Sequence, residues 1–265
     1  MNLHKCILTK NNCYKKGQYI MPKGVMVHST GANNPNLKRY VGPDDGLLGV
    51  NVNNNHWNNP GLNVCVHAFI GKLKDGSIAT YQTLPWNMLG WHAGTGTSGR
   101  SANSTHISFE ICEDALNDAT YFKAVYREAV ELTAYLCEMY NLDPLADGVV
   151  ICHSEGCRRG IASNHGDVEH WFPRFGKTMN DFRADVAAEM EDDMTQEKFN
   201  EMYANMVKEI QEADGSAWSK EARDWAIKVG LIKGSGDGKC MWRSNVTREQ
   251  LVEVLKRLVE DVLKK

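Results

Sequence analysis

Two short apolar runs in this chain each end in a histidine. Residues 24–28 read Gly-Val-Met-Val-His, and residues 149–153 read Val-Val-Ile-Cys-His. An apolar run of this length that stops at a polar residue is typical of a buried strand, and turn- or loop-forming residues follow each run. The pattern therefore predicts two buried strands that present His28 and His153 at their carboxyl ends.

Three further strands are predicted between these two. Residues 64–70 and 78–82 are apolar runs joined by a tight Asp-Gly turn, which is typical of a β-hairpin. Residues 106–113 alternate apolar and polar positions, as a half-buried strand does, and the alternation places Glu110 on the same face as Ser108.

Helical spacing of apolar residues predicts a long helix over 119–140 and another over 178–190. Strands and helices together indicate an α/β domain with a mixed central β-sheet flanked by helices, and we place its boundary near Asp193. Beyond it the sequence has few strand formers and predicts a small, mainly helical C-terminal domain, 194–265. Its expected elements are helices at 196–213, 219–229 and 247–263, the last with a capping box from Thr247 to Gln250, and a Gly-rich turn at 234–238.

Composition narrows the class of protein. A chain of 265 residues can bury a substantial core. Its net charge of −3 and the absence of a basic stripe argue against a nucleic-acid partner. No apolar run is long enough to span a membrane, and the first residues lack the pattern of a secretion signal, so we expect synthesis in the cytoplasm. The eight cysteines are scattered without a CxxC pair, which indicates no disulfide framework.

The segment after His153 is rich in groups that bind metal ions. It carries no helical period, and it places His165, Asp167 and His170 within reach of the strand that ends at His153. Histidine and aspartate are good zinc ligands. Cys157 is a further candidate by its chemistry, and His28 would have to come from the other strand.

A long segment without period, residues 31–63, is rich in Asn, Gly and Pro. Such a segment is usually a functional surface or disordered. Tyr40 and Trp57 favour substrate contact, and disorder of part of the segment remains an open alternative.

The order of several short motifs resembles that of the type 2 N-acetylmuramoyl-L-alanine amidases, the family of phage lysozyme-amidases and peptidoglycan-recognition proteins. The resemblance covers roughly residues 20–185. The motifs are Val-His-Ser-Thr at His28, Val-His-Ala-Phe at His67, Trp-His-Ala-Gly at His92, Ser-Phe-Glu at Glu110 and His-Ser-Glu at His153.

The resemblance implies a catalytic zinc ion held by His28, His153 and a third ligand. Asp167 fits the family pattern for that ligand, although the loop before it is longer than usual, and Cys157 and His170 stay open as alternatives. A catalytic zinc keeps one of its four positions for water. The family further implies Glu110 as general base and proton shuttle and His165 as the group that stabilises the oxyanion. His67, His92 and Trp91 would contact the substrate or support the site.

The tail resembles one S-layer-homology repeat, a kind of module that holds wall polymers. Trp242 and Arg248 offer an aromatic ring and a cation for a secondary wall polymer, while a helical spacer is the alternative. A single copy of the repeat suggests a homo-oligomer through the C-terminal helices.

The expected function is hydrolysis of the bond between N-acetylmuramic acid and L-alanine in bacterial peptidoglycan, by an endolysin of phage type that acts on the wall after its release. A non-catalytic peptidoglycan-binding protein and a cytosolic muropeptide-recycling amidase are the alternatives.

Overall fold

The computed structural model describes residues 1–191, 196–234 and 239–264. The chain divides into two compact units, Met1–Asp193 and Met194–Lys265. The predicted boundary at Asp193 and residues 235–238 of the predicted Gly-rich turn lie outside the described residues. Within the described ranges, no helix combines the length and the apolar character needed to cross a membrane.

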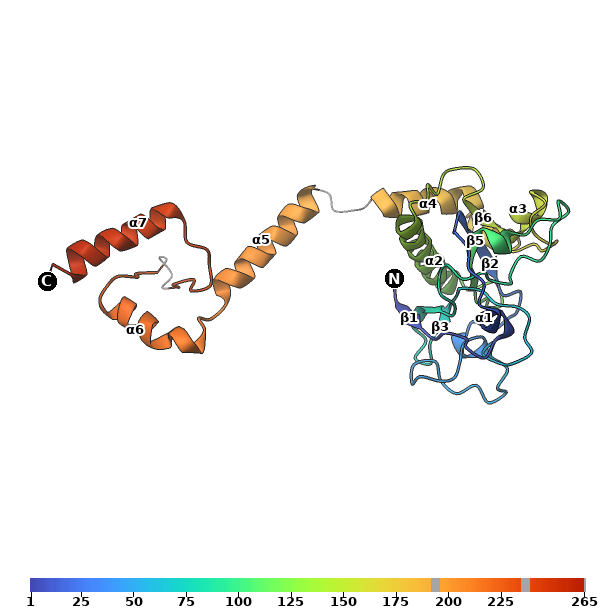
Figure 1. Cartoon of the computed structure of the whole chain (residues 1–265), viewed down its shortest axis with the longest axis horizontal. Helices are drawn as coiled ribbons and strands as arrows, with labels where there is room; N and C mark the ends of the chain where they lie inside the picture. The colour runs from blue at the N-terminus through green and yellow to red at the C-terminus, as the bar shows by residue number, and fades with distance from the viewer. Residues whose placement is uncertain (192–195, 235–238, 265) are drawn as a thin grey trace. The chain divides into compact units, whose positions relative to one another are not determined.

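The first unit is built on one mixed sheet, which confirms the predicted fold class (Figure 1). In the described residues the sheet has the strand order β1-β4-β3-β5-β2-β6. β3 and β4 form the predicted antiparallel hairpin, and the other neighbouring strands are parallel. The strands are β1 (Leu3–Lys5), β2 (Gly24–Ser29), β3 (Ala68–Lys72), β4 (Ile78–Gln82), β5 (His106–Ile111) and β6 (Val150–Cys152).

Two long helices cover one face of the sheet. α2 (Ala119–Tyr140) and α4 (Met179–Glu191) pack against each other, and α2 lies across β2, β3 and β4. The strand residues that point at them are apolar, such as Val25 and Val27 of β2 and Phe109 of β5, and they are completely buried. Because side chains alternate along a strand, the residues between them, including His28 and Glu110, belong to the opposite face.

Loops cover most of that opposite face, and the short helix that follows β6 packs against Met26 of β2. The segment 31–63 contributes Leu37, Tyr40 and Leu48, which pack on Phe69 of β3 as a second apolar cluster. Tyr40 is only 4% exposed and stacks on Phe69, while Trp57 meets the same ring edge-on. The ring of Tyr40 is therefore used to pack the loop onto the sheet, whereas Trp57 stays partly exposed, and its contact with a substrate remains a prediction.

Two other local predictions are also corrected. The segment directly after β6 is not a loop: the helix α3 (His153–Arg158) begins at His153 itself. A short helix of one and a half turns leaves too little apolar period to be recognised in the sequence. In addition, Cys13 of α1 (Asn12–Lys16) forms a disulfide with Cys65, a pairing across 52 residues that no local spacing indicates.

The second unit is helical, as predicted. It contains α5 (Gln196–Glu212), α6 (Lys220–Lys228) and α7 (Arg248–Arg257), and α7 continues as a π-helical turn over Leu258–Val262. The predicted capping box is present, since Thr247 Oγ1 accepts from Gln250 N at 3.1 Å and Gln250 Oε1 accepts from Thr247 N at 2.9 Å.

Candidate active site

Three neighbouring parallel strands bring polar side chains to the same edge of the sheet. His28 is the fifth residue of β2 and pairs in register with Glu110 of β5. β6, on the other side of β2, ends at Cys152, so that His153 follows at the same edge. Carboxyl ends of parallel strands are where α/β proteins commonly form their sites.

The start of α3 fixes the position of His153. Glu155 accepts from the backbone N–H of Cys152 at 3.1 Å and so caps the helix. Arg183 of α4 binds the same carboxylate at 3.0 and 3.1 Å. His153 is therefore held by a helix start that is tied to a second helix.

Asp167 comes from the loop that follows α3. Arg158 forms a bidentate ion pair with Glu169 at 2.7 and 2.8 Å across this loop, and Trp171 and Phe172 are buried in the core just beyond it. The backbone N–H of Ser154 also donates to the Asp167 carbonyl at 3.3 Å. These contacts bring Asp167 back to the histidines although 14 positions separate it from His153.

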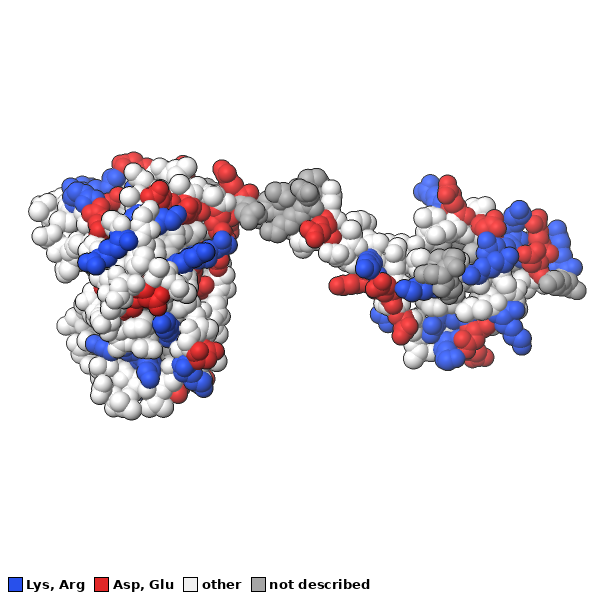
Figure 2. Space-filling model, turned by 180° about the vertical axis from the view of Figure 1, so that it is seen from behind, with Lys and Arg blue, Asp and Glu red and all other residues white. Residues whose placement is uncertain are grey.

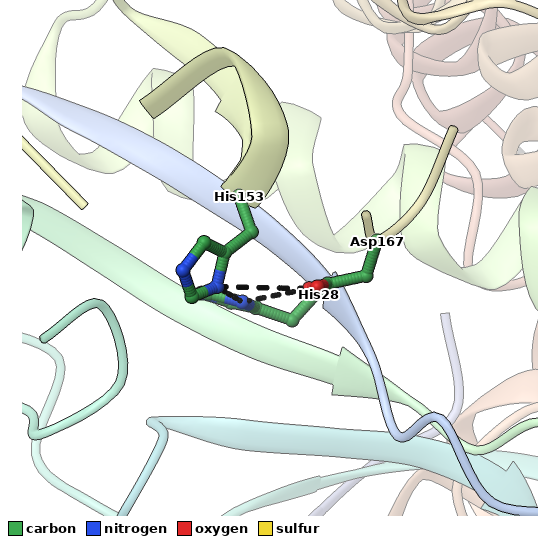
Figure 3. A group of neighbouring side chains, drawn as sticks. All are labelled: His28, His153 and Asp167. Carbon is green, nitrogen blue, oxygen red and sulfur yellow. Dashed lines mark hydrogen bonds and ion pairs between the residues drawn. The ribbon is translucent and has the colours of Figure 1, made fainter. Parts of the chain in front are cut away.

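Figure 3 shows His28, His153 and Asp167 pointing toward one another from three different elements. His28 Nδ1 lies 3.0 Å from Asp167 Oδ2 and 3.1 Å from His153 Nδ1, and His153 Nδ1 lies 3.8 Å from the same carboxylate oxygen. Ligands placed 2.0–2.1 Å from a zinc ion in a tetrahedron are roughly 3.3–3.4 Å apart. The observed spacings bracket that value, so the three side chains fit one zinc ion with little movement.

The second ring nitrogen of His28 and of His153 has a hydrogen-bond partner, as the histidine ligands of a metal ion usually do. His28 Nε2 lies 2.9 Å from His92 Nδ1, and His153 Nε2 lies 3.3 Å from Ser163 Oγ. If the two Nδ1 atoms held a metal ion, the proton of each ring would be on Nε2 and would point at an acceptor. His92 would then have its own proton on Nε2, which is buried without a partner. Burial lowers the pKa of His92 well below its usual value, and the neighbouring His28 lowers it further.

Glu110 lies beside this group with one carboxylate oxygen, Oε2, buried and without a hydrogen-bond partner. Burial raises its pKa well above the usual range, and the nearby charges of Asp167 and Glu113 add to the shift. A carboxyl group in this state readily accepts and holds a proton. His153, in contrast, has its pKa lowered to about 4 by burial and by His28, and its ring is neutral at pH 7.

All these groups open into one cavity of about 760 Å³. Its walls contain eight of the residues singled out in the sequence: His28, Trp91, His92, Glu110, His153, His165, Asp167 and His170. His165 is exposed in it, and its Nδ1 lies 3.2 Å from Ser163 Oγ.

The remaining candidate site residues either lie away from the cavity or bond to another side chain. His67 is completely buried, shares hydrogen bonds with Ser108 and with the carbonyl of Met88, and does not line the cavity. Direct contact of His67 with a substrate is therefore contradicted, because its ring has no exposed surface. Cys157 does not line the cavity either, and His170 Nε2 lies 2.9 Å from the buried carboxylate of Glu113.

Two residues that the sequence did not single out support the site. Ser163 Oγ lies within 3.3 Å of both His153 and His165 and also within 3.2 Å of the Ala93 carbonyl oxygen. Asn103 Oδ1 accepts from the backbone N–H groups of His92 and Ala93 at 2.9 and 2.8 Å. Ser163 is in a loop and Asn103 in the short 3-10 helix Ala102–Ser104, and a lone Ser or Asn in such a segment carries no signal of its own.

The fold has a known counterpart. It is similar to that of the Staphylococcus aureus hydrolase AmiA, crystallised in complex with its ligand, with a TM-score of 0.51, 17% identity, and coverage of 71% of this chain and 82% of that one. A mutant endolysin from Bacillus subtilis has 23% identity and a TM-score of 0.44 over 70% of this chain and 99% of its own. The amidase endolysin LysCS from Clostridium intestinale has 17% identity and a TM-score of 0.34 over 60% and 86%.

No curated protein matches the chain at a significant level. The sequence profile of one family, described as N-acetylmuramoyl-L-alanine amidase, matches residues 18–171. That span is more than half of the chain and contains every residue that lines the cavity. The chain belongs to the N-acetylmuramoyl-L-alanine amidase family and is an enzyme of that class.

Proposed function

We propose that the chain is a zinc-dependent amidase that hydrolyses the bond between N-acetylmuramic acid and L-alanine in peptidoglycan. The observation that carries this proposal is the convergence of His28 Nδ1, His153 Nδ1 and Asp167 Oδ2 at 3.0–3.8 Å beside the cavity. Three protein ligands are the number that a catalytic zinc site uses. When bound, zinc would polarise the scissile carbonyl group and acidify a water molecule.

The protein's own part in the reaction is to move protons and to hold charge. Glu110 would take the proton of the attacking water, which adds to the lactyl carbonyl carbon, and would pass it to the alanine nitrogen as the C–N bond breaks. The raised pKa of Glu110 suits a group that must hold a proton between the two steps.

His165 would stabilise the negative charge that forms on the carbonyl oxygen. Its Nδ1 lies 3.2 Å from Ser163 Oγ, which positions the ring so that a proton on Nε2 would be donated to that oxygen. Trp91 would line the path of the substrate. His92 would support the site, since its Nδ1 meets His28 rather than open space.

Metal analysis and product mass test this function together. We expect about one zinc ion per purified chain and, after digestion of purified wall, peptides that begin with a free L-alanine amine. Full activity after treatment with a strong chelator, or cleavage at another bond, would show that the proposal is wrong.

We further propose an endolysin role on the wall of a bacterial host, as opposed to recycling of soluble muropeptides. The presence of a second unit, Met194–Lys265, supports this, because a recycling enzyme has no need of a targeting module. The test compares turnover on intact wall with turnover on soluble muropeptides. A clear preference for the soluble substrate would favour the recycling alternative.

The second unit would bind a secondary wall polymer through Trp242. This ring lines a cavity of about 550 Å³ together with Arg257, and the guanidinium group of Arg223 lies 5.5 Å from the ring centre. Arg248, the first residue of α7, does not line that cavity. An aromatic ring beside cations suits an anionic, sugar-containing polymer.

A pair of tryptophan variants tests the targeting role in the full chain. Trp242→Ala should reduce the amount of enzyme that sediments with wall, whereas Trp218→Ala, at a side chain that is 88% exposed and outside the cavity, should not. If both variants sediment like the parent chain, the tail is a spacer.

A further inference from the structure

The tail unit, Met194–Lys265, has almost no core of its own. Among its described residues, Ala226 is the one hydrophobic side chain that is buried. Large hydrophobic side chains are exposed along α5 and along the helix that begins with α7. On α5 these are Phe199, Met202, Tyr203, Met206 and Ile210, at 39–56% exposure, and on the later helix Leu251, Val252, Leu255, Val259 and Leu263, at 47–70%. Apolar faces of this size are normally covered.

The exposed residues of α5 follow a heptad pattern. Phe199, Tyr203, Met206 and Ile210 are separated by four, three and four positions, and Ala213 continues the series just beyond the helix. This is the alternation of a and d positions in a coiled coil. Phe199 and Tyr203 already stack on each other along this line, with ring centres 6.2 Å apart.

The other side of α5 is polar, as the pattern requires. From residue 201 on, the b, c and f positions hold Glu201, Ala204, Asn205, Lys208, Gln211 and Glu212, of which all but Ala204 are polar. Apolar and polar residues are thus separated on two sides of one helix, which is the arrangement of a helix that pairs with another along a narrow seam.

We propose that this seam, defined as Phe199, Tyr203, Met206 and Ile210, pairs with the same seam of a second copy of the chain. A heptad seam is self-complementary, because each of its side chains fits between those of an identical helix. Met206 and Ile210 offer a sugar polymer neither stacking surfaces nor hydrogen bonds, whereas all four side chains of the seam can pack against an identical helix. The seam is separate from the cavity of Trp242.

The charge of the tail permits close approach of two copies. It has 13 Lys and Arg residues and 12 Asp and Glu residues, a net charge of +1. On the face that Figure 2 shows, both signs of charge are present on this unit. Pairing would also join two catalytic units in one assembly. A single tail bound to the wall would then keep both catalytic units there.

The test measures the mass of the full chain in solution by sedimentation equilibrium over a wide range of concentrations. We expect a dimer that dissociates on dilution. The double variant Tyr203→Lys with Met206→Glu should be monomeric, because it puts charges into the seam. Asn205→Lys with Lys208→Glu introduces the same two side chains on the polar side of α5, and this matched control should stay dimeric.

A second variant keeps the result interpretable if the charged one unfolds. Tyr203→Leu with Met206→Leu should strengthen the dimer, since leucine is favoured at seam positions. A parent chain that is monomeric at all concentrations would overturn the proposal, as would a charged variant that stays dimeric. A monomeric parent whose charged variant no longer sediments with wall would assign the seam to the polymer instead.

Discussion

The hydrogen bond between His92 and His28 should contribute measurably to zinc affinity. His92 Nδ1 lies 2.9 Å from His28 Nε2, and we expect it to accept the proton that the metal-bound form of His28 carries there. Loss of such a partner typically lowers metal affinity roughly 10- to 100-fold, which corresponds to about 1.4–2.7 kcal/mol. His92→Phe removes the acceptor and fills the space of the ring, so we expect a loss within this range.

The assay is a titration of zinc against a chelator of known affinity, for the parent chain and three variants. His92→Gln keeps an acceptor oxygen and should recover part of the loss, which separates the hydrogen bond from packing. His67→Gln is a buried control, because His67 bonds to Ser108 and Met88 rather than to a zinc ligand. Parent-like affinity in His92→Phe, or equal losses in His92→Phe and His92→Gln, would refute the reasoning.

Three other outcomes are expected. Asp167→Ala should lose zinc while Cys157→Ala retains it, and metal content checks this; the reverse result would make Cys157 the ligand. Glu110→Gln should keep zinc and fold but lose roughly 10²–10⁴-fold in turnover, and His165→Ala should also keep zinc while losing most activity. Because burial lowers the folded-state pKa of His67 to about 4, the unfolded chain binds its proton first as the pH falls. The stability that this neutral histidine contributes is complete above about pH 6.5, and up to about 3 kcal/mol of it is lost between pH 6.5 and 4. Denaturant unfolding across this pH range should show this loss of stability. The loss should be smaller in His67→Gln.

The part of the site that lies on strands could be predicted from the sequence. An apolar run that ends in a polar residue identifies a strand end, and parallel strands place such ends together. His28, Glu110 and His153 meet for this reason. The family resemblance implied the roles, and the apolar spacing predicted the bounds of α2 and the strands of the described sheet except β1.

The part that lies on loops could not be predicted in the same way. Whether Asp167, Cys157 or His170 approaches the histidines depends on α3, on the Arg158–Glu169 ion pair and on the burial of Trp171, and all of these are tertiary contacts. The same holds for the loop of residues 31–63. Its aromatic rings looked available for substrate because nothing local indicates that Phe69 of β3 lies beneath them.

The two units differ in the source of their stability, and this bears on how the enzyme would work. In the first unit the helix α2 buries twelve of its residues, so the site rests on a core that this unit supplies alone. In the tail, the helical spacing of apolar residues predicted the helices but not which surface covers their apolar faces. An amphipathic pattern is the same whether the helix packs against its own chain or against another chain. The described tail buries only Ala226 among its hydrophobic residues, which makes another chain the better partner. Catalysis should then be a property of each chain, whereas retention on the wall should depend on protein concentration.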